Sequence, residues 1–167
     1  MHKIAVTGHR PNKLYGYNLH NPKWIKLAWK MREILLDRIE KYQEIECITG
    51  MALGVDQLFG LVALKLKKQN YPVSIFVAIP CTNQPEKWPD KTYWNTIKNN
   101  ADVVHFVHNG PFTNTCMNER NKYMVDRADE IIAVWNGSRG GTANCVNYAK
   151  KQGKPVTNIY EPVNQEN

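Results

Sequence analysis

Long hydrophobic runs are missing from this sequence. No uninterrupted apolar stretch approaches the roughly 18 residues that a helix needs to cross a bilayer. The first residues also lack the basic start and apolar centre of a secretory leader. We therefore expect a cytoplasmic protein that has no membrane segment.

The cysteines do not have the spacing of a metal site. Four of them lie far apart in the chain, at Cys47, Cys81, Cys116 and Cys145. They form no C-x-x-C pair, so a zinc site of the usual kind is excluded. His105 and His108 lie three residues apart on an expected strand, which sends their rings to opposite faces. We expect free, mostly buried thiols, no bound metal and no cofactor.

Two common phosphate-binding signatures are also absent. No G-x-G-x-x-G follows the first expected strand, and no G-x-x-x-x-G-K-[ST] occurs in the chain. The usual dinucleotide fold and the P-loop are therefore excluded. Glycines instead follow the first, second and fifth expected strands, which favours a ligand the size of a mononucleotide or a ribosyl group.

Positive charge is in excess. With 22 Lys and Arg against 15 Asp and Glu, the 167-residue chain has a formal charge of +7. This charge favours anionic partners, but it does not separate a nucleotide from a nucleic acid. A hydrophobic content of 43% suffices for one domain with an ordinary core. The oligomeric state stays open, and a homo-oligomer is one of the alternatives.

Strand-like and helix-like patterns alternate along the chain. The expected strands are Lys3–Thr7, Ile45–Thr49, Val73–Ile79, Ala101–Val107, Ile131–Trp135 and Pro155–Ile159. This alternation predicts a single-domain α/β fold over residues 1–160, a Rossmann-like, doubly wound, mostly parallel sheet of five to seven strands. The C-terminal ends of the strands should share one edge, where such sheets bind ligands. Residues 161–167 form a polar tail that we expect to be disordered.

The first long helical pattern begins at Asn21 and Pro22, a cap residue followed by proline. Its apolar positions repeat up to about Tyr42, at Ile25, Ala28, Trp29, Leu35, Leu36 and Ile39. This stripe predicts that Trp29 is a core residue rather than a platform for a ligand.

The glycine-rich turn after the fifth expected strand is the strongest candidate for a ligand site. It offers free amides, a hydroxyl pair and a positive charge directly before a helix, which suits an anion. Its candidate phosphate ligands are Gly137, Ser138, Gly140, Gly141 and Thr142. The alternative is that the glycines only make a tight connection from strand to helix.

Polar residues also follow the first expected strand. Gly8, His9 and Arg10 come directly after it and are candidates for contacting a phosphate or a sugar. The alternative, to which we give equal weight, is that Arg10 and Lys13 are solvated loop charges.

The second expected strand ends in a similar way. Gly50 and Gly54 would let a phosphoribosyl group approach the backbone. Asp56 would accept from ribose hydroxyls, or would simply favour the dipole of the next helix, which is the interpretation we prefer. In the loop after the third strand, Trp88 would stack on a base or pin the loop to the domain, and we favour pinning.

Four motifs stand at the ends of these strands. They are TGHRP from Thr7, TGMALGVD from Thr49, the spaced Pro80, Gln84, Trp88 and Tyr93, and the helix from Asn121 to Asp129 followed by GGT. In this order they resemble the YpsA-like branch of the SLOG superfamily over residues 4–160. That superfamily also includes the DprA-like DNA-processing proteins and the LOG phosphoribohydrolases. The resemblance implies a Rossmann-like fold and a site for nucleotides or their derivatives.

The resemblance to the LOG enzymes extends to single residues. Met117, Glu119 and Arg120 resemble the M-H-E-R-K start of the LOG helix, so Arg120 and Glu119 are the candidate catalytic residues. The glutamate that serves glycosidic cleavage in LOG enzymes is replaced here by Cys145. A thiol is a poor substitute for a carboxylate beside an oxocarbenium-like centre. Enzymatic activity stays open, and binding is favoured over hydrolysis.

The same helix carries two candidate phosphate ligands, Arg120 and Asn121. Arg120 lies off the apolar stripe of Met117, Met124 and Val125, so we expect its guanidinium to be exposed and to hold phosphate in a bidentate way.

The leading hypothesis from the sequence is a binding domain for a nucleotide or nucleotide-derived ligand, with a sensor as one role. The first alternative is a LOG-like hydrolase that cleaves the N-glycosidic bond of nucleoside monophosphates. The second is a DprA-like binder of single-stranded nucleic acid, motivated by the charge of +7 and the loop aromatics.

Overall fold

Six parallel strands form the sheet at the centre of the computed structural model, which describes residues 1–162. They are β1 (His2–Gly8), β2 (Ile45–Thr49), β3 (Val73–Ile79), β4 (Val103–Phe106), β5 (Glu130–Val134) and β6 (Val156–Asn158). Their order across the sheet is β4-β3-β2-β1-β5-β6. The chain therefore builds outward from β1 to β4 and then crosses back to place β5 on the other side of β1. Ile4 in β1 pairs with Cys47 on one side and with Glu130 on the other.

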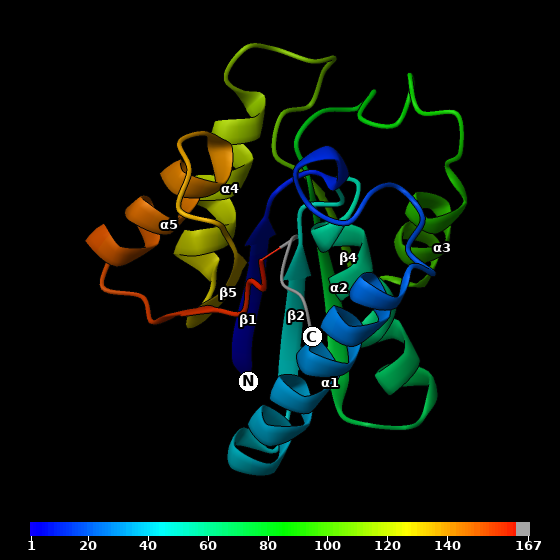
Figure 1. The fold of residues 1–167 in the computed structure, drawn as a ribbon, viewed down its shortest axis with the longest axis vertical. Coiled ribbons are helices and arrows are strands. Elements are labelled where there is room, and N and C mark those ends of the chain that lie inside the picture. The colour runs from blue at the N-terminus through cyan, green and yellow to red at the C-terminus, as the bar shows by residue number, and fades with distance from the viewer. Residues whose placement is uncertain (163–167) are drawn as a thin grey trace.

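Helices cover both faces of this sheet, as Figure 1 shows. The first face carries α1 (Pro22–Tyr42), α2 (Val55–Lys68) and α3 (Thr92–Asn100), and the second carries α4 (Cys116–Arg127) and α5 (Gly141–Lys151). A short 3-10 helix, η1 (Pro11–Lys13), follows β1. Each face has its own cluster of buried apolar residues, and the cluster under α1 and α2 is the larger. The Rossmann-like, doubly wound fold expected from the sequence is confirmed.

The strands lie where the apolar runs place them. β2 and β3 have the expected bounds, and the others differ from the expected ranges by no more than a few residues at either end. Every residue of β2 and β5 is buried, in agreement with strands covered on both faces. Two of those residues are acidic and find arginine partners: Glu46 pairs with Arg127 at 2.8 Å, and Glu130 pairs with Arg38 at 2.8 Å.

The prediction that Trp29 is a core residue is wrong. Its side chain is 64% exposed on the outer side of α1, whereas Trp24 on the opposite side is fully buried. The buried face of α1 consists of Trp24, Leu27, Met31 and Leu35. This set has the helical spacing of three, four and four residues, so the sequence contains two overlapping apolar stripes on adjacent faces. The predicted start of the helix is confirmed, because the Asn21 side chain accepts a hydrogen bond from the amide of Lys23 at 3.0 Å.

The cysteines and the chain end complete the description. Cys47, Cys81, Cys116 and Cys145 are free and buried, as expected. Of the polar tail, Glu161 is held in place, because its backbone oxygen accepts from the Tyr15 hydroxyl at 2.9 Å. Residues 163–167 of that tail lie outside the described residues. No helix within residues 1–162 is both long and apolar enough to cross a membrane.

Candidate anion-binding cleft

A cleft with a volume of about 330 Å³ opens at the C-terminal edge of the sheet, between the ends of β1 and β5. These two strands are neighbours, and the chain reverses its direction of growth between them. Ligand sites of open α/β sheets lie at this kind of switch point, because the loops on either side diverge there. Four segments line the cleft, through Val6, Thr7, Gly8, His9, Arg10, Asn12, Lys13, Ala52, Asp56, Met117, Arg120, Asn121, Arg139, Gly140, Gly141 and Thr142.

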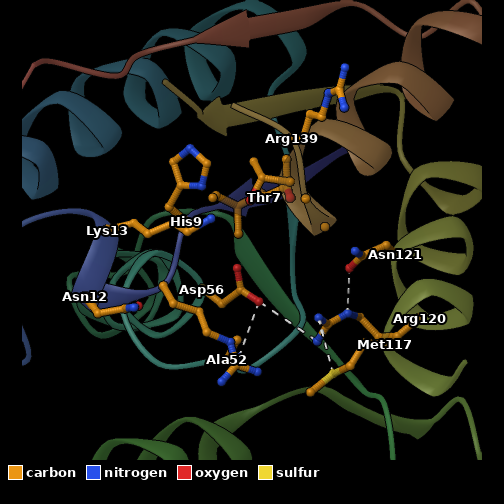
Figure 2. A pocket seen from close by; sticks show the side chains of 16 residues that line it. Thr7, His9, Asn12, Lys13, Ala52, Asp56, Met117, Arg120, Asn121 and Arg139 are labelled. Carbon is orange, nitrogen blue, oxygen red and sulfur yellow. Dashed lines mark hydrogen bonds and ion pairs between the residues drawn. The ribbon is translucent and has the colours of Figure 1, made fainter. Parts of the chain in front are cut away.

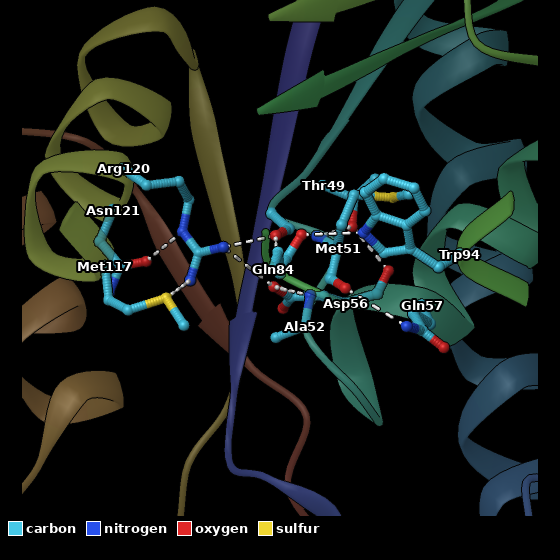
Figure 3. A network of polar contacts seen from close by, with 11 residues as sticks. Thr49, Met51, Ala52, Asp56, Gln57, Gln84, Trp94, Met117, Arg120 and Asn121 are labelled. Carbon is cyan, nitrogen blue, oxygen red and sulfur yellow. Dashed lines mark hydrogen bonds and ion pairs between the residues drawn. The ribbon is translucent and has the colours of Figure 1, made fainter. Parts of the chain in front are cut away.

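Arg120 reaches from the first turns of α4 toward the loop after β2, as Figure 3 shows. Its Nη1 donates to the backbone oxygen of Gly50, and its Nε donates to Oδ1 of Asn121 at 2.9 Å. The same Nη1 lies 4.0 Å from a carboxylate oxygen of Asp56. Arg120 is only 6% exposed, so the expectation of an exposed guanidinium is wrong. It is a buried member of the cleft wall, because its long side chain crosses from one element to another.

The geometry around Gly50 explains why this position has no side chain. A Cβ atom there would lie 2.4 Å from Nη1 of Arg120, so the glycine makes room for the guanidinium. The backbone oxygen of Gly50 also accepts from Nε2 of Gln84 at 3.0 Å. Gly54 has φ +87° and packs against Pro11. Neither glycine is among the residues that line the cleft, although both were candidates for approach by a sugar.

Asp56 lies in the first turn of α2, as expected, and it lines the cleft. Its carboxylate accepts from the amide of Ala52 at 3.3 Å, and its backbone oxygen accepts from the Thr49 hydroxyl at 2.7 Å. Burial raises the pKa of Asp56, and the nearby Arg120 opposes that rise. The side chain can thus favour the helix dipole and face a ligand at once.

The glycine turn before α5 forms the opposite wall. Gly140, Gly141 and Thr142 line the cleft, whereas Gly137 and Ser138 do not. Gly140 has φ 138°, a conformation that favours glycine. No heavy atom lies within 4 Å of a Cβ built at Gly140 or at Gly141, so packing does not require small residues there. Open backbone at the start of an 11-residue helix, where amides have no partner within the helix, suits an anion.

His9 directly follows β1 and contacts Asn136, which lies just after β5. The amide of Asn136 donates to its Nε2 at 3.0 Å, and Oδ1 of Asn136 lies 2.8 Å from the same nitrogen. Burial lowers the pKa of His9, so the ring is neutral near pH 7. Its neighbour Gly8 lines the cleft, and a Cβ there would lie 2.6 Å from the Val55 side chain. Close packing of β1 against α2 therefore requires this glycine.

Four cationic residues line the cleft: Arg10, Lys13, Arg120 and Arg139. Figure 2 labels the last three. Asp56 is the one acidic residue in the lining. This excess of positive charge in a partly enclosed space attracts anions. Arg10 and Lys13 thus lie at the cleft.

Sequence reasoning did not name several lining residues as ligand contacts. They are Val6, Thr7, Asn12, Lys13, Ala52, Met117 and Arg139. Two of them carried a usable signal: Arg139 lies within the glycine turn, and Lys13 follows the first strand closely.

Of the residues implied by the LOG comparison, Arg120 lines the cleft, whereas Glu119 and Cys145 do not. Glu119 is exposed, accepts from the Thr115 hydroxyl at 3.1 Å and is not part of the cleft lining. Cys145 is buried, and burial raises the pKa of its thiol. No group of three or more His, Cys, Asp or Glu side chains within the described part of the chain is placed to hold a metal ion.

The loop after β3 packs onto the domain. Trp88 is half-buried against the larger apolar cluster, which supports the pinning role expected for it. Gln84 is buried and bridges two elements, because its Oε1 accepts from the Trp94 indole at 2.9 Å while its Nε2 holds Gly50.

The family comparison agrees with the resemblance found in the motifs. The model of YpsA, described as the YspA SLOG family, matches residues 4–161, nearly the whole chain. The chain belongs to this SLOG family. The SPbeta prophage-derived protein YoqJ of Bacillus subtilis is 34% identical over 146 residues, which cover 80% of this chain and 85% of that protein. A UPF0398 protein of Brevibacillus brevis is 27% identical over 143 residues, covering 84% and 76%.

A solved structure of DNA processing protein A from Helicobacter pylori is also similar to this SLOG-family chain. It superimposes with a TM-score of 0.66 at 16% identity, covering 99% of this chain and 68% of that one. The description of that structure concerns its single-stranded DNA binding mode. At this identity the likeness shows the fold alone.

Proposed function

We propose that this SLOG-family domain binds a nucleotide or nucleotide-derived ligand, with the phosphate in the cleft between β1 and β5. One observation carries the proposal: four cationic side chains and an open glycine turn at a helix start face the same space. Gly140 has a backbone conformation that favours glycine, and packing does not require a small residue at 140 or 141, so the open backbone of this turn leaves room for a ligand. Guanidinium groups and backbone amides are the usual partners of phosphate oxygens.

The arrangement favours binding over hydrolysis. Cleavage of a glycosidic bond needs a carboxylate beside the anomeric carbon. Glu119 is outside the lining, and Cys145 has no carboxylate to offer. Asp56 is the one acidic residue that a bound ligand would meet, and Arg120 and Ala52 already hold its carboxylate. A binding protein that senses its ligand fits this arrangement.

The experiment compares thermal unfolding of the wild type and Arg139→Ala in the presence of nucleoside mono- and diphosphates, ribose 5-phosphate and pyrophosphate. A ligand at about a hundred times its Kd stabilises by about 2.7 kcal/mol. Loss of one charge-assisted contact, worth about 1.5 to 3 kcal/mol, should weaken binding about tenfold or more. Arg139 is exposed, so the unliganded melting temperature should not change.

Lys151→Ala is the matched control, because Lys151 is an exposed cation at the far end of α5. It should leave both the ligand response and the stability unaltered. An equal ligand response in Arg139→Ala and the wild type would place the phosphate elsewhere. Absence of any response to the whole panel would refute the proposal.

The second candidate function is binding of single-stranded nucleic acid. It is supported by the fold similarity to DNA processing protein A, whose described structure concerns single-stranded DNA, and by the formal charge of +7. The same cationic cleft would then hold a phosphate of the strand. Salt dependence separates this function from binding of a free nucleotide, as argued in the Discussion.

A further inference from the structure

A second, smaller hollow borders η1, because Pro11 of that short helix lines it. Its volume is about 80 Å³. The side chains that give it chemical character are Tyr17, Gln57, Asp90 and Tyr93, contributed by the loops after β1 and β3 and by the starts of α2 and α3. We call this feature the η1 hollow. None of these four residues lines the cleft.

Gln57 supplies an acceptor without a protein partner. Its side chain is buried, with 3% of the residue exposed, and its Nε2 donates to the backbone oxygen of Met51 at 3.3 Å. Because a carbonyl oxygen can only accept, the amide must turn its NH₂ toward Met51 and its Oε1 away from it, as drawn in Figure 3. The hydrogen bond of the Gln57 side chain is the one to Met51, and within residues 1–162 no side-chain nitrogen or oxygen is both fully buried and unpaired. Oε1 is therefore accessible from the η1 hollow, which Gln57 lines, and a donor on a ligand can reach it there.

The other residues of the η1 hollow suit a planar ring that carries N–H groups. Tyr17 is 68% exposed, and the Tyr93 hydroxyl lies 3.2 Å from Nε2 of His20. Exposed aromatic side chains provide stacking surface for bases. Asp90 is an exposed carboxylate that accepts from the Thr92 amide at 2.9 Å, which leaves further acceptor capacity. The hollow thus offers aromatic surface and acceptors, and an anion is disfavoured there.

The η1 hollow and the cleft are within reach of one ligand. Pro11 lines the hollow, whereas its neighbour Asn12 lines the cleft. In the loop after β2, Leu53 lines the hollow and Ala52 lines the cleft. In each of these segments the two lining residues are adjacent in sequence, and the Cα atoms of adjacent residues lie about 3.8 Å apart. The hollow and the cleft therefore border the same two short segments. A ligand with a phosphate in the cleft can therefore extend a ring across η1.

We propose that the η1 hollow binds the amino-bearing edge of a nucleobase whose phosphate group lies in the cleft. The proposal rests on the proposed function, and it narrows the ligand to adenine, cytosine or guanine nucleotides. An exocyclic amine has two hydrogens to give to Gln57 Oε1 and Asp90. Hypoxanthine, uracil and thymine place a carbonyl oxygen there, which would face acceptors and be repelled.

The test measures affinities by titration calorimetry for the 5′-monophosphates of adenosine, inosine, cytidine and uridine, with ribose 5-phosphate as the probe of the cleft alone. The wild type should bind the adenosine compound about tenfold more tightly than the inosine compound. The affinity for the cytidine compound should exceed that for the uridine compound by a similar factor, because each pair differs by about one hydrogen bond to the protein. Gln57→Met, which has no acceptor of equal strength, should remove this preference.

Tyr17→Ala gives a second readout that does not depend on a buried residue. Tyr17 is largely exposed, so the variant should fold normally and bind all four nucleotides about tenfold more weakly through lost stacking. Binding of ribose 5-phosphate should not change. Trp29→Ala, which removes an equally exposed aromatic residue from α1, is the matched control and should bind like the wild type.

The failures can be told apart. If neither ribose 5-phosphate nor any nucleotide binds, the proposed function fails and this inference fails with it. If the nucleotides bind with no preference for the amine, if the preference survives in Gln57→Met, or if Tyr17→Ala binds the nucleotides as tightly as the wild type, the base subsite is refuted while the cleft stands.

The base can come from a free nucleotide or from a single strand. Oligomers of deoxyadenosine, deoxycytidine and thymidine distinguish these sources. Preference for the first two over thymidine, together with weak mononucleotide binding, would identify a strand as the source. Preference among the mononucleotides would identify a free nucleotide, and preference in neither set would overturn the inference.

Discussion

Arg120 shows how one side chain can connect two elements that border a cleft. It lies in the wall of the cleft and is also buried between α4 and the loop after β2. Its bonds reach Gly50 and Asn121, and its charge faces Asp56. Removing it should therefore damage the fold, and a loss of ligand binding in such a variant would say little about direct contact.

We predict that Arg120→Ala lowers the free energy of unfolding by about 3 kcal/mol, because a broken buried pair leaves the carboxylate of Asp56 uncompensated. Urea unfolding at neutral pH measures the loss. Adding Asp56→Asn should recover part of it, since the neutral amide still accepts from the Ala52 amide. Additive losses in the double variant would mean that the two side chains do not interact.

We predict that His9 makes the protein less stable in mild acid. Burial lowers its pKa, so the unfolded chain binds more protons than the folded chain between that lowered value and the ordinary one. The contribution of His9 is therefore complete above about pH 6.5 and is lost as the pH falls through the pKa of the folded state. Urea unfolding between about pH 7.5 and about pH 5.5 should show a shallower decline in His9→Asn than in the wild type. Equal slopes in the two proteins would assign the decline to other groups.

The sequence cannot supply contacts of this kind. Arg120 and Gly50 are 70 positions apart, and no local pattern links them. Gly50 looked like a position for ligand approach because glycine has that use in many loops. In the structure, a glycine is needed at position 50 because the guanidinium of Arg120 fills the space that a Cβ atom would occupy. Gly140 and Gly141, whose purpose is local, were placed at the cleft from the sequence alone.

At the scale of elements, the strands were predictable and the orientation of α1 was not. Apolar runs such as residues 131–134 are buried on both sides, so they identify a strand without a choice of face. A surface helix buries only one of its faces, so the sequence must also indicate which face that is. Residues 24–39 of α1 contain two apolar stripes, and the stripe with Trp24 lies in the core because its indole donates to the Gly16 oxygen at 2.8 Å and packs edge-on against Tyr15.

We predict opposite outcomes for the two tryptophans of α1. Trp24→Ala should lower the free energy of unfolding by about 3 to 5 kcal/mol, since it empties a fully buried site. Trp29→Ala should change it by no more than about 0.5 kcal/mol, because an exposed position loses little packing. Chemical denaturation followed by circular dichroism compares them without relying on indole fluorescence. A large loss for Trp29 would mean that its surface is covered, for instance by a second copy of the chain.

At the scale of the whole molecule, the charge of +7 distinguishes the two candidate functions. Binding to single-stranded DNA releases counterions, so the logarithm of the association constant should fall with the logarithm of salt with a slope of about −0.7 per phosphate contacted. A mononucleotide in the cleft displaces far fewer counterions and should respond weakly to salt.

We predict a slope of about −2 for an oligonucleotide if the cleft and its surroundings hold about three phosphates, and a reduction of about 0.7 in Arg139→Ala. Fluorescence anisotropy over a salt series provides both values. Lys151→Ala should keep the wild-type slope. If no DNA binding occurs even at low salt, the nucleic-acid function is excluded and the mononucleotide remains.

The strand order also determines when the cleft can exist during synthesis. β1 pairs with β2 on one side, and β2 follows it closely in the chain. Its other neighbour, β5, emerges from the ribosome only after β2, β3, β4 and four helices. A nascent chain that ends before β5 can assemble four of the six strands, but it lacks the glycine turn and the wall that completes the cleft. If the proposed function holds, a ligand would bind finished molecules and would protect them from proteases.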